Sequence, residues 1–197
     1  MGWMEPNTAL DVRIWDVDHG SAAFLRAGNK NVVLDCSAQE NFSPAEYISN
    51  EYGINTIHYL IVSHPHNDHI EDLDMVDECG LKPNIFARNK ADDVREIIKE
   101  KVEDEQDGGD QDYVEDAEYY LMLDEYEGTP DPSPAEPKWA RGALSSDGFR
   151  ADGGPDRGVT FHNYSPSAPQ TGDNEYKKLN NSSTVTVVNC FGFKYSQ

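Results

Sequence analysis

The N-terminal third of the chain alternates apolar and polar side chains with the period of a β-strand. Residues 10–17 follow this pattern and predict a strand with one buried face. Residues 21–27 and 31–35 flank a Gly-Asn-Lys turn and predict a hairpin. Residues 54–62 end in four consecutive apolar side chains, which predicts a buried strand.

Helical signals follow the hairpin. Residues 43–53 begin with Ser43 as a helix N-cap and Pro44 at the first helical position, and they end at Gly53. Residues 70–80 have apolar side chains at helical spacing and end in glycine, so we expect one helix there. Further helices are predicted at residues 91–102 and 113–123, and further strands at 82–88, 157–166, 180–188 and 191–195. The mixture of strands and helices predicts an α/β fold.

The length of 197 residues is sufficient for one domain with a sizeable core, and we expect a single domain over residues 1–197. Residues 103–154 differ in composition from the rest, because they are acidic and rich in proline and glycine. This segment is predicted to be an insertion or a lid over the cleft.

Candidate chemistry is concentrated in residues 63–69, directly after the buried strand at residues 54–62. Three of the six histidines lie here together with Asp68. Imidazole and carboxylate groups are the ligands that zinc and similar divalent ions prefer. His64 and His66, two positions apart, can point the same way, whereas Asp68 and His69 must diverge. The alternative is a polar loop that is merely rich in histidine.

The sequence His64-Pro65-His66-Asn67-Asp68-His69 matches the His-x-His-x-Asp-His motif and resembles the metallo-β-lactamase fold hydrolases. The resemblance implies an αββα sandwich, of which the chain would form the N-terminal half to two thirds. It implies that His64 and His66 bind one metal ion and that Asp68 and His69 bind a second. It also implies catalytic roles for Asp68 and His69 in activating water. One or two zinc ions are expected, and manganese is a further possibility.

Three other residues are candidates through the same resemblance. Asp35 occupies the position of an aspartate that supports the histidine loop by hydrogen bonds, although it could be an ordinary carboxylate at a strand end. His19 lies in the turn at residues 16–22, and His162 lies where a third histidine ligand of the first metal ion could fall. A turn residue and a strand residue, respectively, are the simpler interpretations of these two histidines.

The turn at residues 16–22 and the segment 180–188 resemble one branch of the family, the hydrolase domain of DNA-uptake competence proteins. Two departures stand out within this resemblance. Asp18 replaces the glycine of that branch, and Glu71-Asp72 replaces the Gly-Gly pair that usually follows the motif.

The net charge of −21, from 16 basic and 37 acidic residues, disfavours a broad basic surface for nucleic acid. A small-molecule or phosphodiester substrate remains compatible with this charge, because bound metal ions supply local positive charge. Three widely spaced cysteines imply no disulfide framework. No apolar run long enough for a membrane span is present in the sequence. We therefore expect a soluble, cytoplasmic protein.

The resemblance covers residues 10–197, and the later metal-binding motifs of the family would come after Gln197. We therefore expect either a further C-terminal segment or completion of the site by a partner subunit or a second copy. Three functions remain open from the sequence: a metal-dependent hydrolase of phosphodiester or other ester-like bonds, a catalytically incomplete metal-binding or protein-interaction module, and a lactam or thioester hydrolase.

Overall fold

The computed structural model describes residues 10–27, 30–84, 86–88, 92–106, 108–125, 149–150, 159–164, 185–190 and 193–196. In the strands from residue 149 onward only the backbone is described. Within the described ranges, no helix is long and apolar enough to cross a membrane.

The first sheet has the strand order β1-β2-β3-β5-β7. Its strands are β1 (Leu10–Ile14), β2 (Ala22–Ala27), β3 (Lys30–Cys36), β5 (Tyr59–Ile61) and β7 (Phe86–Ala87). β1, β2 and β3 are antiparallel, whereas β3, β5 and β7 are parallel neighbours. The predicted hairpin is thus confirmed.

The predicted strand at residues 54–62 is interrupted at His58, which separates β4 (Thr56–Ile57) from β5. The backbone amide of His58 donates to the Asn31 carbonyl, and its ring Nδ1 accepts from the Asn31 amide at 3.1 Å. β4 pairs instead with β6 (Lys82–Pro83), so the predicted strand at 82–88 is also divided between β6 and β7.

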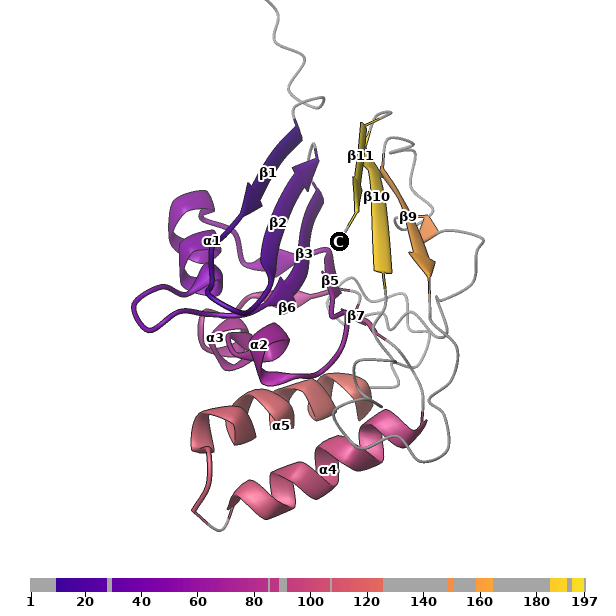
Figure 1. Ribbon diagram of the computed structural model, residues 1–197. Coiled ribbons are helices and arrows are strands. Elements are labelled where there is room, and N and C mark those ends of the chain that lie inside the picture. The colour runs from indigo at the N-terminus through magenta and orange to yellow at the C-terminus, as the bar shows by residue number, and fades with distance from the viewer. Residues whose placement is uncertain are drawn as a thin grey trace, which may run out of the picture.

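A second, antiparallel sheet has the order β11-β10-β9-β8. Its strands are β8 (Phe149–Arg150), β9 (Val159–Tyr164), β10 (Val185–Cys190) and β11 (Phe193–Ser196). The last three confirm the C-terminal strand predictions. Figure 1 shows this sheet on the side of the first sheet that lies opposite α1 (Pro44–Tyr52).

Helix α1 follows its local sequence signals closely. The Ser43 hydroxyl accepts from the Glu46 amide at 3.0 Å, and Gly53 ends the helix in the left-handed conformation with φ of 60°. The other helices are α2 (Asn67–Ile70), α3 (Leu73–Glu78), α4 (Asp92–Gln106) and α5 (Gln111–Glu125).

The prediction of one continuous helix over residues 70–80 is wrong, because α2 and α3 are separate. The amide of Asp72 donates to the Cys36 carbonyl at 2.9 Å instead of to the carbonyl of Asp68, four residues earlier. The carbonyl of Asp68 instead accepts from the Ser21 amide at 3.0 Å. Two tertiary hydrogen bonds thus replace one helical bond and tie the histidine loop to β3 and to the turn before β2.

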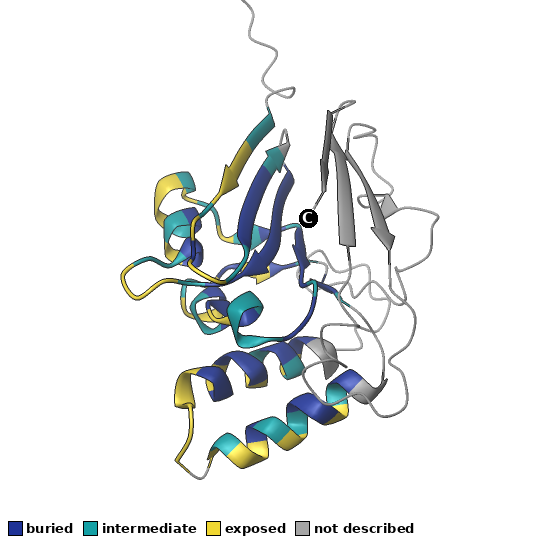
Figure 2. Ribbon diagram, viewed as in Figure 1, coloured by how far each residue is buried: buried dark blue, intermediate teal, exposed yellow. Residues whose placement is uncertain are grey.

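The core lies between the first sheet and the helices (Figure 2). Phe24, Val33 and Leu60 point from the sheet into this cluster, and α1 to α5 all contribute to it. The opposite face of the sheet is buried as well, with Leu25 and Leu34 at most 1% exposed.

Helix α5 is part of this core, and its described side chains include five buried apolar ones: Tyr113, Val114, Ala117, Tyr120 and Leu123. The first part of segment 103–154 therefore packs against the body of the protein. Residues 126–148 and 151–154 lie outside the described residues, so the expected insertion or lid stays a prediction there.

Candidate functional site

The candidate site lies where two parallel strands end. Leu34 of β3 is in register with Ile61 of β5, so Asp35 and Ser63 follow at the same edge of the sheet. The Ser63 amide donates to Asp35 Oδ1 at 2.6 Å, and the Ser63 hydroxyl donates to Oδ2 at 2.8 Å. The start of the histidine loop is thus attached to Asp35.

Asp35 also fixes the far end of the loop, because His69 Nδ1 lies 2.7 Å from Asp35 Oδ2. The aspartate is 1% exposed and has a positive φ of 49°, which is uncommon for a residue with a side chain. Such backbone strain persists only where surrounding contacts enforce it. Here the three hydrogen bonds to Ser63 and His69 hold the carboxylate in place.

The three histidine rings of the loop lie close together. The ring centroid of His64 is 4.0 Å from that of His69 and 4.8 Å from that of His66. The Ser63 Oγ atom is 3.1 Å from His64 Nδ1. Because the hydroxyl proton of Ser63 is donated to Asp35, Nδ1–H of His64 is the group that can donate to Oγ. In that tautomer the lone pair of His64 lies on Nε2.

The environment keeps two of these rings neutral. Burial, together with smaller effects of the neighbouring His69 and His66, lowers the pKa of His64 to about 3. Burial also lowers the pKa of His66, with smaller effects from Asp68, which raises it, and from Lys101 and His69, which lower it. Neutral imidazole is the form that binds metal ions.

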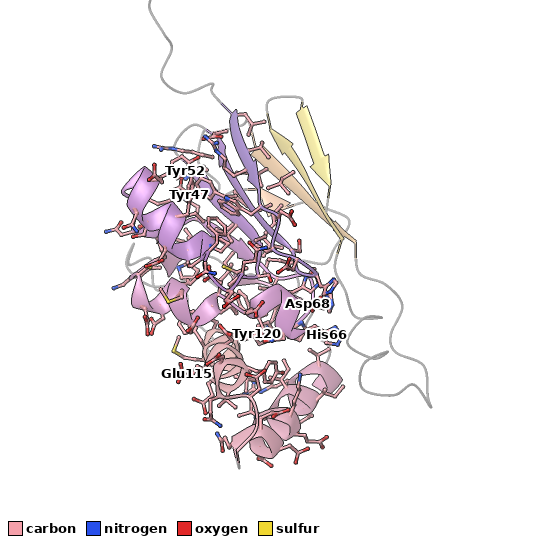
Figure 3. The ribbon with its side chains drawn as sticks, turned by 60° about the vertical axis from the view of Figure 1, so that its left-hand side comes forward. Tyr47, Tyr52, His66, Asp68, Glu115 and Tyr120 are labelled. Atoms are coloured by element: carbon pink, nitrogen blue, oxygen red, sulfur yellow. The ribbon has the colours of Figure 1, made fainter. Side chains whose placement is uncertain are left out.

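His69 behaves differently. Burial alone would lower the pKa of His69, but its hydrogen bond to Asp35 and the charges of Asp35 and Asp68 raise it. Its Nε2 lies 3.8 Å from Asp68 Oδ2. Because Nδ1 of His69 is bound to Asp35, its Nε2 and the Asp68 Oδ2 atom face each other. These two atoms favour a positive charge between them, whether a proton or a metal ion. His66 and Asp68 lie close together in Figure 3.

The donor atoms suit a divalent ion in their chemistry, since they combine neutral imidazoles with a carboxylate. Their positions do not form a closed ligand set. Within the part of the chain that the structure describes, no group of three or more His, Cys, Asp or Glu side chains is arranged to hold a metal ion. A bound ion would therefore require these side chains to adjust.

A comparison of the sequence with protein-family models identifies the family of this chain. The model of the "Metallo-beta-lactamase superfamily" matches residues 15–134, which is more than half of the chain. The chain belongs to the metallo-beta-lactamase superfamily. A search of curated proteins found no match.

Two solved structures are similar to this superfamily member. One is the metallo-beta-lactamase fold protein YhfI from Bacillus subtilis, at 13% identity and a TM-score of 0.42. The alignment covers 90% of this chain and 53% of that one, so this chain spans about half the length of YhfI. The other is a putative metallo-beta-lactamase from Thermotoga maritima, at 10% identity and a TM-score of 0.48, covering 92% of this chain and 73% of that one.

The two remaining candidate histidines belong to other segments of the chain. His19 is exposed in the turn before β2, and this turn contacts the loop through the hydrogen bond from Ser21 to Asp68. His162 lies in β9 opposite Val187 of β10. Its side chain is outside the described residues, so its predicted role as a ligand stays a prediction.

Two buried aspartates of this metallo-beta-lactamase superfamily member, Asp72 and Asp116, were not identified from the sequence. Asp72 accepts from the Ala45 amide at 2.7 Å, and burial raises its pKa to about 7. Asp116 of α5 accepts from the Asp74 amide at 2.9 Å, and burial raises its pKa to about 8. Asp72 lies in the acidic segment that was predicted as one helix, and Asp116 lies in the acidic helix α5, so no sequence signal distinguished them from exposed carboxylates.

Proposed function

We propose that this chain forms the metal-binding part of a metal-dependent hydrolase, with His64, His66, Asp68 and His69 as ligands of one or two zinc ions. Manganese is the second candidate metal. The observation that carries the proposal is the hydrogen bond of 2.7 Å between Asp35 and His69 Nδ1. Metal-binding histidines usually donate their other ring nitrogen to a carboxylate in this way.

The residues of the chain have distinct parts in this proposal. Asp35 orients the His69 ring, so that Nε2 faces Asp68 rather than the interior. Ser63 holds His64 in the tautomer that leaves Nε2 available. Asp68, whose side chain is 46% exposed, can reach a water molecule at the surface of the site and accept its proton. A divalent ion, when bound, supplies the Lewis acidity that activates water near neutral pH.

The proposed substrate is a small molecule with a phosphodiester or another ester-like bond. The preference for a phosphodiester is supported by the resemblance of residues 16–22 and 180–188 to the competence-protein branch. The net charge of −21 supports a small substrate over a long nucleic acid held on a basic surface. A lactam or thioester hydrolase is the alternative within the same chemistry.

A second candidate function is a metal-binding or interaction module without turnover. It is favoured by one observation, namely that the described histidine and carboxylate side chains do not converge as a closed set. In this case the chain would bind an ion, and catalysis would need residues from elsewhere.

A substrate panel with a metal measurement distinguishes these functions. The zinc-loaded chain and the manganese-loaded chain would be assayed with bis(4-nitrophenyl) phosphate, 4-nitrophenyl acetate, a thioester and a chromogenic β-lactam. The proposal predicts chelator-sensitive hydrolysis of the phosphodiester that is lost in a His64→Ala/His66→Ala variant. Metal binding without any hydrolysis would favour the module, and hydrolysis of the lactam or the thioester alone would favour the alternative hydrolase.

A further inference from the structure

Strand β1 forms an open edge of the first sheet. Among the described strands it pairs with β2 alone, and Figure 1 shows it as the outermost strand of this sheet. The Trp15 amide donates to the Ala22 carbonyl at 3.1 Å, in continuation of the register between the two strands. Because hydrogen-bonded residues alternate along an antiparallel pair, Leu10, Val12 and Ile14 direct their amide and carbonyl groups away from β2.

The side chains of β1 leave apolar surface exposed beside this edge. Ile14 is 64% exposed and Val12 is 36% exposed, and they lie on one face of the strand because they are two positions apart. Figure 2 shows much of β1 as exposed. Proteins commonly protect such an edge with a proline, a bulge or charges that repel a second strand. Strand β1 contains no proline or bulge, and its two charged residues, Asp11 and Arg13, have opposite signs.

The charges of β1 fit an antiparallel copy of the same strand. If two copies pair about a twofold axis at Val12, Asp11 of each copy faces Arg13 of the other. Leu10 of each copy then faces Ile14 of the other. Opposite charges directly across an antiparallel pair are stabilising, whereas like charges are destabilising. An axis at Asp11 would place two aspartates opposite each other, and an axis at Arg13 would place two arginines opposite each other.

The backbone groups favour the same register. The residues that would face each other in hydrogen-bonded pairs, namely Val12 with its own copy and Leu10 with Ile14, are the ones whose polar backbone groups point outward. Each pair can therefore exchange both N–H···O=C bonds. The Arg13 Nε atom already lies 3.1 Å from Asp11 within one copy, and the guanidinium has further N–H groups for the carboxylate of the second copy.

We propose that this edge is a dimerisation surface, at which β1 pairs antiparallel with β1 of a second copy about a twofold axis at Val12. A second copy is the occupant because the Asp-Val-Arg sequence of the strand is complementary to itself. The interface is isologous and joins the first sheets of the two copies into one continuous sheet. A single strand of five residues provides a small interface, so the dimer is weak and depends on concentration. This inference does not rest on the proposed function.

Sedimentation velocity over a range of protein concentrations would measure the dimer of the full chain. Asp11→Arg and Arg13→Asp each place like charges opposite each other in a homodimer, but the two variants present opposite charges to each other when they are mixed. Each variant alone should dimerise at least about tenfold more weakly than the wild type, and an equimolar mixture should regain about the wild-type affinity. Lys82→Asp is the matched control, because it changes the charge of an exposed residue by the same amount as Arg13→Asp and should leave the dimer unchanged.

Val12→Pro tests the backbone pairing independently of charge. It removes an amide that points away from β2, and proline is tolerated at such a position of an edge strand. We expect the dimer to weaken at least about tenfold, with the fold of each variant checked by circular dichroism and thermal unfolding. A wild type that stays monomeric up to about 1 mM would overturn the proposal. So would a dimer that is unaffected by Val12→Pro, or a mixture of the two charge variants that associates no better than either alone. If a charge variant did not fold, Val12→Pro would still decide.

Discussion

Replacing Asp35 by asparagine tests how the site is held together. The carboxylate accepts three hydrogen bonds, two from Ser63 and one from His69, at 2.6, 2.8 and 2.7 Å. An asparagine carbonyl can keep the bond from the Ser63 amide, but its NH₂ group then faces the Ser63 hydroxyl and His69 Nδ1. The Ser63 hydroxyl can rotate to accept a hydrogen bond from this NH₂ group. His69 must move its proton to Nε2, which blocks the atom that faces Asp68.

The expected losses of stability and of metal affinity follow from these hydrogen bonds. One charge-assisted hydrogen bond to a buried carboxylate is lost, so we expect the free energy of unfolding of the metal-free chain to fall by about 1.5–3 kcal/mol. Loss of such a carboxylate partner typically weakens metal affinity about 10- to 100-fold. Urea unfolding would measure the first effect, and zinc titration against a chelator would measure the second. Nitrogen-15 NMR at pH 8 would report the tautomer of His69.

Asp77→Asn is the control for this experiment, because Asp77 is an exposed aspartate on α3. It should change none of the three measurements. The reasoning would be refuted if Asp35→Asn kept His69 protonated on Nδ1 and bound zinc within about threefold of the wild type.

Three further predictions concern the surroundings of the site. Burial raises the pKa of Asp72 from 3.8 to about 7, so its ionisation costs the folded state about 4 kcal/mol. The wild type should therefore lose stability relative to Asp72→Asn as the pH rises from 4 to 7, and parallel urea-unfolding results across this range would contradict the argument. Gly20→Ala would place a Cβ atom 2.5 Å from Ser37 Cβ and 2.6 Å from the Asp68 carbonyl oxygen, so calorimetry should show a loss of about 1–3 kcal/mol, and an unchanged melting temperature would be inconsistent with this contact. Ser43→Ala removes the N-cap of α1 and should cost about 1 kcal/mol in urea unfolding, whereas Ser43→Thr, which keeps the hydroxyl that caps α1 and bonds Asp72, should not.

Local signals in the sequence predicted the elements whose ends are determined locally. Helix α1 is the clearest example, because the hydroxyl of Ser43 and the left-handed conformation of Gly53 are properties of single residues. The hairpin of β2 and β3 was predicted for a similar reason, since its turn and its alternation lie within one short segment. The metallo-β-lactamase resemblance of the sequence agrees with the family match over residues 15–134.

The break between α2 and α3 could not be predicted from periodicity. It depends on the bonds from Asp72 to Cys36 and from Ser21 to Asp68, which join segments far apart in the sequence. The burial of Asp72 and Asp116 could not be predicted either, because a buried aspartate and an exposed one look alike in an acidic segment of sequence. Tertiary contacts decided both cases against the local pattern.

Within the candidate site, the motif indicated His64, His66, Asp68 and His69, and the strand end indicated Asp35. Their assignment as metal ligands and support remains a prediction. The sequence did not indicate that Ser63 bridges Asp35 and two histidine rings, since that contact depends on parallel pairing of β3 and β5.

The most direct test of the proposed metal site is the zinc content of the purified chain after loading and dialysis, measured by elemental analysis. The wild type would be compared with His64→Ala/His66→Ala and with Cys79→Ala, which removes a metal-competent thiol outside the loop. The account predicts at least one zinc ion per chain in the wild type and in Cys79→Ala, and none in the double variant. A double variant that retains the full zinc content of the wild type would contradict it.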